Sequence, residues 1–305
     1  MYRQSLKGPN IAFACRMFPT PMALRLSLLV LLTAVGASAR AEHPLTIEPT
    51  DPRHEMVIDL KYELPVLLVG GTILGGSQVL GAYYGPSTCR WCDTPSSLNA
   101  FDAAGRRAFA GADRAKAGLG SDLLAYAGMP LLTLGLDLAA SLDTTRGMRG
   151  KYRARRFGID VLLMTEAMTT TLTVMQLSKF ATQRRRPSAI DEPTDGTRTV
   201  DQNLSFFSGH TALAFSLATS AGTIASLRHE RLAPVVWAVG VAAATATGMS
   251  RVAADQHFAS DVIIGSLVGS AIGILVPVLH RYRTPVRVGG QASATAGLIS
   301  VSGNL

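Results

Sequence analysis

The sequence predicts an all-α fold, a bundle of six helices that is embedded in a membrane or attached to one. Of the 305 residues, 48% are hydrophobic and 16% are charged, which excludes a disordered chain. Six apolar segments rich in Leu, Ala, Gly and Thr lack the alternation of a half-buried strand, and their lengths suit membrane spans or buried helices. The segments cover residues 64–84, 123–142, 159–178, 209–227, 234–249 and 260–280.

Charged residues inside two of these segments keep an alternative open. Asp137, Asp160 and Glu166 lie within the second and third segments, and ionisable groups are rare in membrane spans. A soluble helical domain in the periplasm therefore stands beside the membrane bundle as a second interpretation.

The first 41 residues have the features of an export signal. Several basic residues precede an apolar run from Leu26 to Val35, and Ala-Ser-Ala at 37–39 or Ala-Arg-Ala at 39–41 suits a signal peptidase. Ten apolar residues are too few to cross a bilayer comfortably, so a cleaved signal peptide is favoured over an uncleaved anchor. The predicted parts are a signal peptide (1–41), a helical domain (42–283) and a C-terminal tail (284–305) to which no function is assigned.

Charge and cysteine content narrow the function classes. The formal net charge of +8 includes five basic residues of the leader, and no basic stripe interleaved with aromatic residues is present, so nucleic acid is excluded as a partner. Outside the leader only Cys89 and Cys92 remain. In an oxidising compartment they are expected to form a local disulfide. A redox pair or half a zinc site is disfavoured because no βαβ pattern or second ligand pair accompanies them.

Between the first two apolar segments the pattern predicts one amphipathic helix over residues 98–119. Arg106, Arg107, Arg114 and Lys116 fall on its polar side and are interpreted as a solvated face.

Three polar clusters interrupt the apolar segments. In SRVAADQHFASDV, His257 and Asp261 are four residues apart, so on a helix the carboxylate could accept a hydrogen bond from the imidazole. In KFATQRRRP, Lys179 and Arg186 are two helical turns apart. The third cluster, FSGH, begins the fourth apolar segment. Each cluster alone has an ordinary structural explanation, namely a satisfied pair, loop charges or a helix N-cap.

Their order along the chain changes this interpretation. The clusters end segment three, begin segment four, and join segments five and six, so an up-and-down bundle brings all three to one end. Lys179, Arg186 and Arg251 would then meet His210 and His257. Such a concentration of cations requires an anion, and a phosphoryl group suits both arginine and the backbone N–H groups of a helix N-terminus, here at Ser208 and Gly209.

At these positions the chain resembles the type 2 phosphatidic acid phosphatases (PAP2) and the vanadium haloperoxidases that share their fold. The family pattern K-x6-RP, PSGH, SR-x5-H-x3-D is matched by K179-FATQRR-RP, FSGH210 and S250-R-VAADQ-H257-FAS-D261. One departure is Phe207, where the family has proline; it puts the rigidity of the loop in doubt more than the chemistry. Asp255 has no assigned role.

The resemblance implies a role for each matching residue. His257 would attack phosphorus, Asp261 would orient it, and His210 would protonate the leaving oxygen and later activate water. The phosphoryl oxygens would be held by Lys179, Arg186, Arg251, Ser208 and the Gly209 amide. Because cations take the place of magnesium, and no carboxylate cluster with metal-ligand spacing is present, no metal and no cofactor are expected. Arg184 and Arg185 are interpreted as solvated flanks.

The predicted function is hydrolysis of a lipid phosphate or lipid pyrophosphate by an exported protein of the cell membrane, with its site in the periplasm. A soluble periplasmic acid phosphatase and, less favoured, a vanadium haloperoxidase use the same motifs. No feature of the sequence indicates an oligomeric state. Six full spans after a cleaved signal peptide would place the site in the cytoplasm, which conflicts with the predicted periplasmic site. Either the signal peptide is not cleaved, or fewer than six segments span the membrane, or the site does not face the periplasm.

Overall fold

The computed structural model describes residues 56–111, 113–191, 199–281, 287–293 and 296–302. The predicted signal peptide lies outside these residues. The helices are α2 (Leu60–Tyr84), α3 (Ala100–Phe109), α4 (Arg114–Leu123), the π-helical turn η3 (Leu124–Gly128), α5 (Met129–Thr144), α6 (Gly150–Thr182), α7 (Gly209–Leu227), α8 (Ala233–Ala253) and α9 (Ala259–Arg281), with 3₁₀ turns η4 (Pro187–Ala189) and η5 (Val200–Asn203) between α6 and α7. A β-hairpin of β1 (Arg287–Ser293) and β2 (Ala296–Ser302) follows.

The predicted fold class is confirmed, since every one of the six apolar segments lies within helix. The second segment is longer than predicted, because α4, η3 and α5 follow one another without a break from Arg114 to Thr144. The tail, to which no function was assigned, contains the antiparallel hairpin.

The predicted amphipathic helix over 98–119 is wrong, because two helices occupy this stretch. Asn99 begins α3 by accepting a hydrogen bond from the Asp102 backbone N–H (2.9 Å). Asp113 begins α4 by accepting one from the Lys116 N–H (3.0 Å). The chain breaks between them because a side-chain oxygen that caps a helix N-terminus holds its own residue out of helical conformation.

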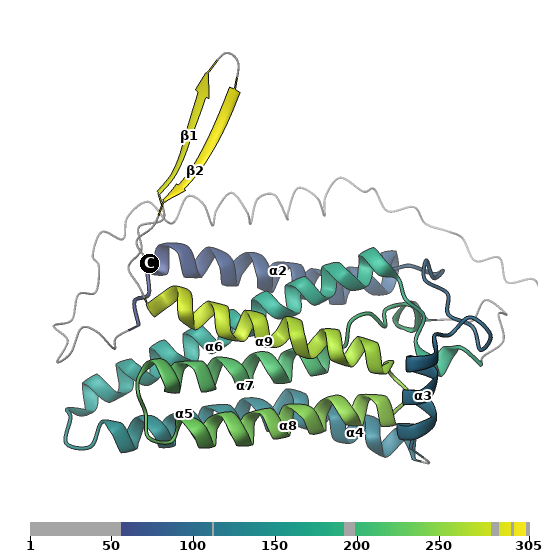
Figure 1. Cartoon of the computed structure of the whole chain (residues 1–305), viewed down its shortest axis with the longest axis horizontal. Coiled ribbons are helices and arrows are strands. Elements are labelled where there is room, and N and C mark those ends of the chain that lie inside the picture. Colours follow the sequence, from purple (N-terminus) through teal and green to yellow (C-terminus); the bar gives the residue numbers. More distant parts are fainter. Residues whose placement is uncertain (1–55, 112, 192–198, 282–286, 294–295, 303–305) are drawn as a thin grey trace, which may run out of the picture. The chain divides into compact units, whose positions relative to one another are not determined.

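Helix α7 is the centre of the bundle and packs against α5, α6, α8 and α9 (Figure 1). Its closest partner is α9, which presents Gly265, Gly269 and Gly273 to it. A Cβ at Gly269 would lie 2.2 Å from the Ala212 carbonyl oxygen, and one at Gly273 would lie 2.4 Å from that of Ser216. We call these three residues the glycine seam. Only glycine lets the two backbones approach this closely.

Five helical segments are long and apolar enough to cross a membrane. They are Leu60–Gly81, Arg114–Thr144, Gly150–Thr182, Ala233–Ala253 and Ala259–Arg281. Large apolar side chains on them face outward, among them Leu68, Leu131 and Leu267. An apolar outer surface on helices of this length indicates an integral membrane protein, with α7 enclosed by the other helices.

The connections alternate between the two ends of the bundle. Residues 85–111, 183–191, 199–208 and 254–258 lie at one end, called the site end below (Figure 1). The far end holds the two short connections at 145–149 and 228–232, and there the Val57 N–H also donates to the carbonyl oxygen of His280 (2.9 Å).

Candidate functional site

His257 lies at the site end in the connection between α8 and α9, and its side chain is 1% exposed. Its Nε2 is 3.3 Å from Arg186 Nη1. Its Nδ1 is 3.8 Å from Asp261 Oδ2, too far for the predicted hydrogen bond. The prediction assumed one helix over both residues, whereas α9 begins only at Ala259.

The predicted cations surround this imidazole. Burial lowers the pKa of His257 well below its ordinary value, and the positive charges of Arg186, Lys179 and Arg251, followed by His210, lower it further. The structure thus brings together the groups from all three sequence clusters. A neutral imidazole keeps a lone pair that can attack an electrophile.

Arg186 is held rigidly beside His257. Its Nε donates to the Asp201 carbonyl oxygen and its Nη2 to Asp201 Oδ1, both at 2.9 Å, while Nη1 donates to the Gln256 carbonyl oxygen at 3.0 Å. Burial alone would raise the pKa of Asp201, but the charges of Arg186 and Lys179 outweigh it and lower that pKa. A carboxylate therefore stands beside the cations and offsets part of their charge.

His210 and Arg251 meet at Asp122, which the sequence analysis did not select. Asp122 Oδ1 lies 2.7 Å from His210 Nε2 and 3.0 Å from Arg251 Nη1. Arg251 Nη1 also donates to Ser121 Oγ (2.9 Å). Asp122 sits at the junction of a polar stretch with an apolar segment, and nothing in its spacing connects it to residues 210 and 251.

The start of α7 corrects part of the predicted phosphate cradle. Ser208 caps the helix, its hydroxyl accepting from Thr211 Oγ1 at 2.9 Å, and its backbone N–H donates to the Asp261 carbonyl oxygen at 3.1 Å. The Ser208 N–H is therefore committed within the protein. Gly209 is the first residue of α7, where a backbone N–H has no partner within the helix.

Phe207 does not line an entrance. Its ring is 2% exposed and packs in a small apolar cluster with Met175 and Ala212. The side chain points into the bundle, so it does not contact the lipid chain of a bound substrate.

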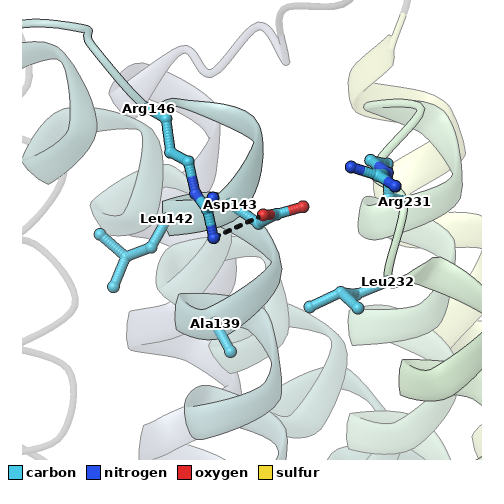
Figure 2. Close-up of a pocket in the computed structure, with 6 residues that line it drawn as sticks. All are labelled: Ala139, Leu142, Asp143, Arg146, Arg231 and Leu232. Atoms are coloured by element: carbon cyan, nitrogen blue, oxygen red, sulfur yellow. Dashed lines mark ion pairs between the residues drawn. The ribbon is translucent and has the colours of Figure 1, made fainter.

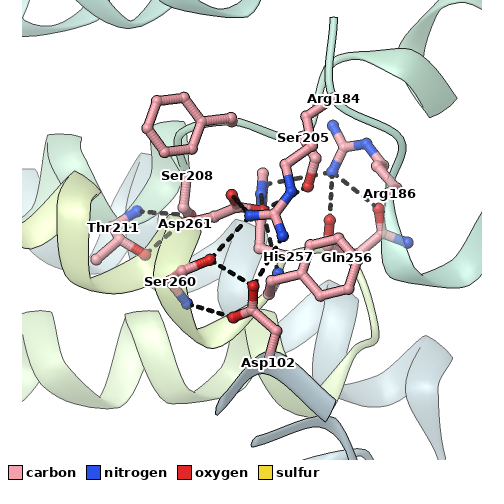
Figure 3. Close-up of polar contacts among 12 residues, drawn as sticks. Asp102, Arg184, Arg186, Ser205, Ser208, Thr211, Gln256, His257, Ser260 and Asp261 are labelled. Carbon is pink, nitrogen blue, oxygen red and sulfur yellow. Dashed lines mark hydrogen bonds and ion pairs between the residues drawn. The ribbon is translucent and has the colours of Figure 1, made fainter. Parts of the chain in front are cut away.

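Arg184 is the most deeply buried cation of the site end, and its interpretation as a solvated flank is wrong. Its side chain is 0% exposed, and the guanidinium lies between the rings of Trp91 and Phe258 at 4.2 and 4.1 Å. Nε donates to Asp93 (2.9 Å). Nη2 donates to Asp102 (2.7 Å) and Nη1 to Asp261 (2.6 Å) (Figure 3). These residues form what we call the Arg184 network.

The same network fixes the carboxylate of Asp261. Oδ1 accepts from Arg184, while Oδ2 accepts from Ser205 Oγ (2.6 Å) and from the Phe258 N–H (3.1 Å) (Figure 3). Burial would raise the pKa of Asp102, but its bonds with Arg184, Asn99 and Ser260 outweigh that effect and lower it. Sequence reasoning missed this network because its members come from three distant stretches of the chain.

A disulfide joins Cys89 and Cys92, whose Cα atoms are 5.3 Å apart. It brackets Trp91, whose backbone N–H donates to the Gln183 carbonyl oxygen (3.4 Å) and whose carbonyl accepts from the Arg185 N–H (3.0 Å). The disulfide therefore shapes the loop that covers Arg184.

Asp255, unassigned from the sequence, anchors the two short helices. Arg106 contacts it through Nε and Nη2, both at 2.8 Å, and Arg114 Nη1 lies 3.0 Å from it. Arg106 and Arg114 were predicted to lie on a solvated face. They instead attach α3 and α4 to the connection that carries His257.

Two cavities lie at opposite ends of the bundle. One of about 450 Å³ opens beside the cations and is lined by Arg114, Ala115, Gly118, Leu119, Asp122, Asp201, Arg251 and Gln256. A larger one of about 540 Å³ lies at the far end, between α5 and the 228–232 connection, around Asp143 and Arg146 (Figure 2). The smaller cavity is the one that touches the candidate site.

Comparison with known proteins agrees with this geometry. Residues 160–285 match the PAP2 superfamily. The chain carries a PAP2-superfamily region. All three motifs, from Lys179 to Asp261, fall inside it.

Two individual proteins are similar to this chain. A lipid A 1-phosphatase from Porphyromonas gingivalis is 33% identical over 132 residues, which are 43% of this chain and 26% of that protein. The chain therefore spans about a quarter of that relative's length. The crystal structure of a transmembrane PAP2-type phosphatidylglycerolphosphate phosphatase from Bacillus subtilis aligns at 18% identity with a TM-score of 0.44, covering 74% of this chain and 98% of that one.

Proposed function

We propose that the protein hydrolyses a phosphate ester or pyrophosphate of a membrane lipid through a phosphohistidine intermediate. The observation that carries this proposal is that His257 is buried and lies beside Arg186, with Lys179 and Arg251 near enough to lower its pKa. An apolar pocket would not gather three cations around an imidazole, because their charges repel one another until an anion binds.

The geometry suits the following steps. His257 Nε2, the nitrogen beside Arg186, attacks phosphorus while the bond to the leaving oxygen breaks and His210 supplies that oxygen with a proton. His210 then takes a proton from the water that cleaves the phosphorus–nitrogen bond. The cations bind the equatorial oxygens, where charge concentrates in the transition state. Asp261 Oδ2, 3.8 Å from His257 Nδ1, places a negative charge beside the ring, which becomes positive when Nε2 is phosphorylated.

The lipid substrate is supported by the position of the site at one end of a membrane bundle and by the similarity to a lipid A 1-phosphatase. Asp122, Asp201 and Gln256 line the adjoining cavity, so the head group is expected to carry hydroxyl or amide donors as well as the phosphate.

The disulfide supports an orientation for the site. Cys89–Cys92 packs at the site end, and disulfides persist in oxidising compartments such as the periplasm. We therefore place the site on the periplasmic face and residues 56–59 on the cytoplasmic face, the opposite of what a cleaved signal peptide over 1–41 would give. In a Cys15→Ser background, an impermeant maleimide applied to intact cells should label Arg107→Cys at the site end and spare Met148→Cys at the far end. The reverse pattern would refute this orientation.

A direct test of the mechanism is to quench turnover of a ³²P-labelled lipid phosphate in alkali, where phosphohistidine survives. Wild type should retain label, and His257→Ala should lose both label and all but about 10⁻³ of activity or less. His229→Ala is the matched control, since His229 lies at the far end. Labelling that persists in His257→Ala would contradict the assignment.

The same preparation separates the lipid from the soluble substrate hypothesis. Wild type is expected to prefer a long-chain lipid phosphate over para-nitrophenyl phosphate in kcat/KM, because the cavity opens at a membrane-embedded bundle. Equal values would favour a broad-specificity phosphatase.

A further inference from the structure

A second polar cluster lies away from the phosphate-binding cations, where Glu63 of α2, Glu166 of α6 and His280 of α9 converge. One possible ligand atom from each side chain lies within 4.8 Å of the other two. Glu63 is in the first turn of α2 and His280 in the last turn of α9, so the cluster belongs to the far end. All three residues lie inside candidate membrane spans, where ionisable side chains require partners.

The imidazole is oriented so that a lone pair faces the two carboxylates. His280 Nδ1 lies 2.7 Å from the Val276 carbonyl oxygen. A carbonyl can only accept, so Nδ1 carries hydrogen, and the neutral ring has its lone pair on Nε2. That nitrogen is 2.8 Å from Glu63 Oε1 and 3.6 Å from Glu166 Oε2. With the neutral ring three acceptors converge, so either protons or a cation must lie between them.

Glu166 supplies the independent observation. It is 8% exposed, and its Oε2 is buried without a hydrogen-bond partner among the described residues. The charged groups that act on it are Glu63 and His280. One proton on Nε2 would leave the cluster with a net negative charge inside the membrane, which a second proton shared between Glu63 and Glu166 would remove. A divalent cation bound to the neutral imidazole and both carboxylates would bring the charge to zero.

We propose that Glu63, Glu166 and His280 form a divalent-cation site, and that zinc is the ion suited best to it. Two carboxylate oxygens and one imidazole nitrogen are a donor set that zinc accepts, with a fourth position left for water. The bond from Nδ1–H to a backbone carbonyl is the outer contact that metal-bound histidines make.

The site would attach a peripheral helix. Helix α2 packs mainly on α6, and its outward residues, among them Leu64 and Leu68, are half exposed. A cation bound by one residue from each of α2, α6 and α9 would hold α2 against the bundle by bonds that do not depend on apolar packing. Its role is structural and separate from the chemistry at His257.

The test uses tag-free protein in detergent, stripped with EDTA and then exposed to zinc. Elemental analysis after gel filtration should find about one zinc per chain in wild type, and Glu166→Gln should weaken zinc binding roughly tenfold or more. Zinc should also raise the thermal midpoint of wild type and not of Glu166→Gln, because a ligand stabilises only a state that binds it. Asp143→Asn, an acidic residue at the same end outside the cluster, should behave as wild type.

Either of two results would overturn the proposal: wild type that holds no more zinc than Glu166→Gln, or a zinc-induced shift of equal size in both. If Glu166→Gln fails to fold, His280→Gln takes its place, and the wild-type comparison with and without zinc still decides. None of these measurements uses phosphatase activity, so they are independent of the proposed function.

Discussion

The two ends of the bundle bury charge in different ways. At the site end, each carboxylate oxygen of Asp102 and Asp261 accepts at least one hydrogen bond, and Arg184 donates from all three of its nitrogens. At the far end, Arg156 pairs with Glu230 and Arg228 with Asp160, but a third acid, Asp137, is 1% exposed and neither of its oxygens has a hydrogen-bond partner among the described residues. One network is satisfied and the other carries an excess acid.

The difference indicates what each network does. A satisfied buried network allows one geometry, because any movement leaves a charge unpaired. Such a network suits a site in which the His257 and Asp261 side chains must keep a fixed relative position. A network with one acid more than it has arginines still joins helices, but it holds its side chains in position less strictly. Removal of a charge should therefore have opposite effects on stability at the two ends.

The largest effect is expected for Arg184→Gln. The change leaves three buried carboxylates without their common cation, which should lower the free energy of unfolding by about 3–5 kcal/mol and reduce kcat more than it changes KM. Thermal unfolding in detergent and steady-state kinetics measure the two effects. The control is Arg107→Gln, which changes an exposed arginine at the same end. Its free energy of unfolding should stay within about 0.5 kcal/mol of that of wild type. Similar losses in both variants would mean that the Arg184 network does not stabilise the site end more than an exposed arginine does.

A smaller loss is expected for Asp255→Asn. The amide can still accept from Arg106 but no longer carries the charge that Arg106 and Arg114 share, so about 1.5–3 kcal/mol of stability should be lost. Limited proteolysis between α3 and α4 should become faster. If the cleavage rate is unchanged, α3 and α4 do not depend on this contact.

At the far end, Asp137→Asn should raise stability by about 1 kcal/mol. The substitution keeps the shape of the side chain and replaces an acid that is buried without a hydrogen-bond partner among the described residues by a group that never carries charge. The measurement is the thermal midpoint in detergent, beside Asp143→Asn as a neutral reference. A decrease would mean that the carboxylate has a partner, such as an internal water.

The smallest effect concerns pH, and its sign differs between the ends. The folded-state pKa of Asp102 is lowered from 3.8, so its contribution is present above about pH 4 and is lost as pH falls through the lower folded value. The pKa of Glu230 is raised from 4.5, first by burial, so lowering the pH through this range favours the folded state there. Between pH 6 and 3, Asp102→Asn should flatten the acid loss of stability and Glu230→Gln should steepen it. Identical slopes would contradict the assignment of these shifts.

The sequence predicted the convergence of Lys179, His210, Arg251 and His257 because those residues occupy the ends of successive helices, and alternation of direction places such ends together. It could not predict Arg184, since the identity of its partners depends on how residues 93 and 102 fold back over residue 261. The separation of Glu63, Glu166 and His280 along the chain likewise leaves no spacing pattern. The helix break could have been predicted, because Asp113 is of a residue type that caps helix N-termini.

The glycine seam has a consequence for how this protein can vary. At each of the three positions a carbonyl oxygen of α7 or of its N-cap Ser208 lies 2.2 to 2.7 Å from where a Cβ would be. A backbone atom cannot adopt another rotamer to make room, so a larger residue at position 265, 269 or 273 has to move a whole helix. Helix α7 begins at His210's neighbour Gly209, and α9 carries Asp261 in its first turn. A methyl group added at the glycine seam would therefore displace α7 or α9, and the displacement would reach the residues that these helices carry at the site end. Lipid-facing leucines are expected to tolerate replacement by other apolar residues, whereas these three glycine positions are expected to accept almost no replacement.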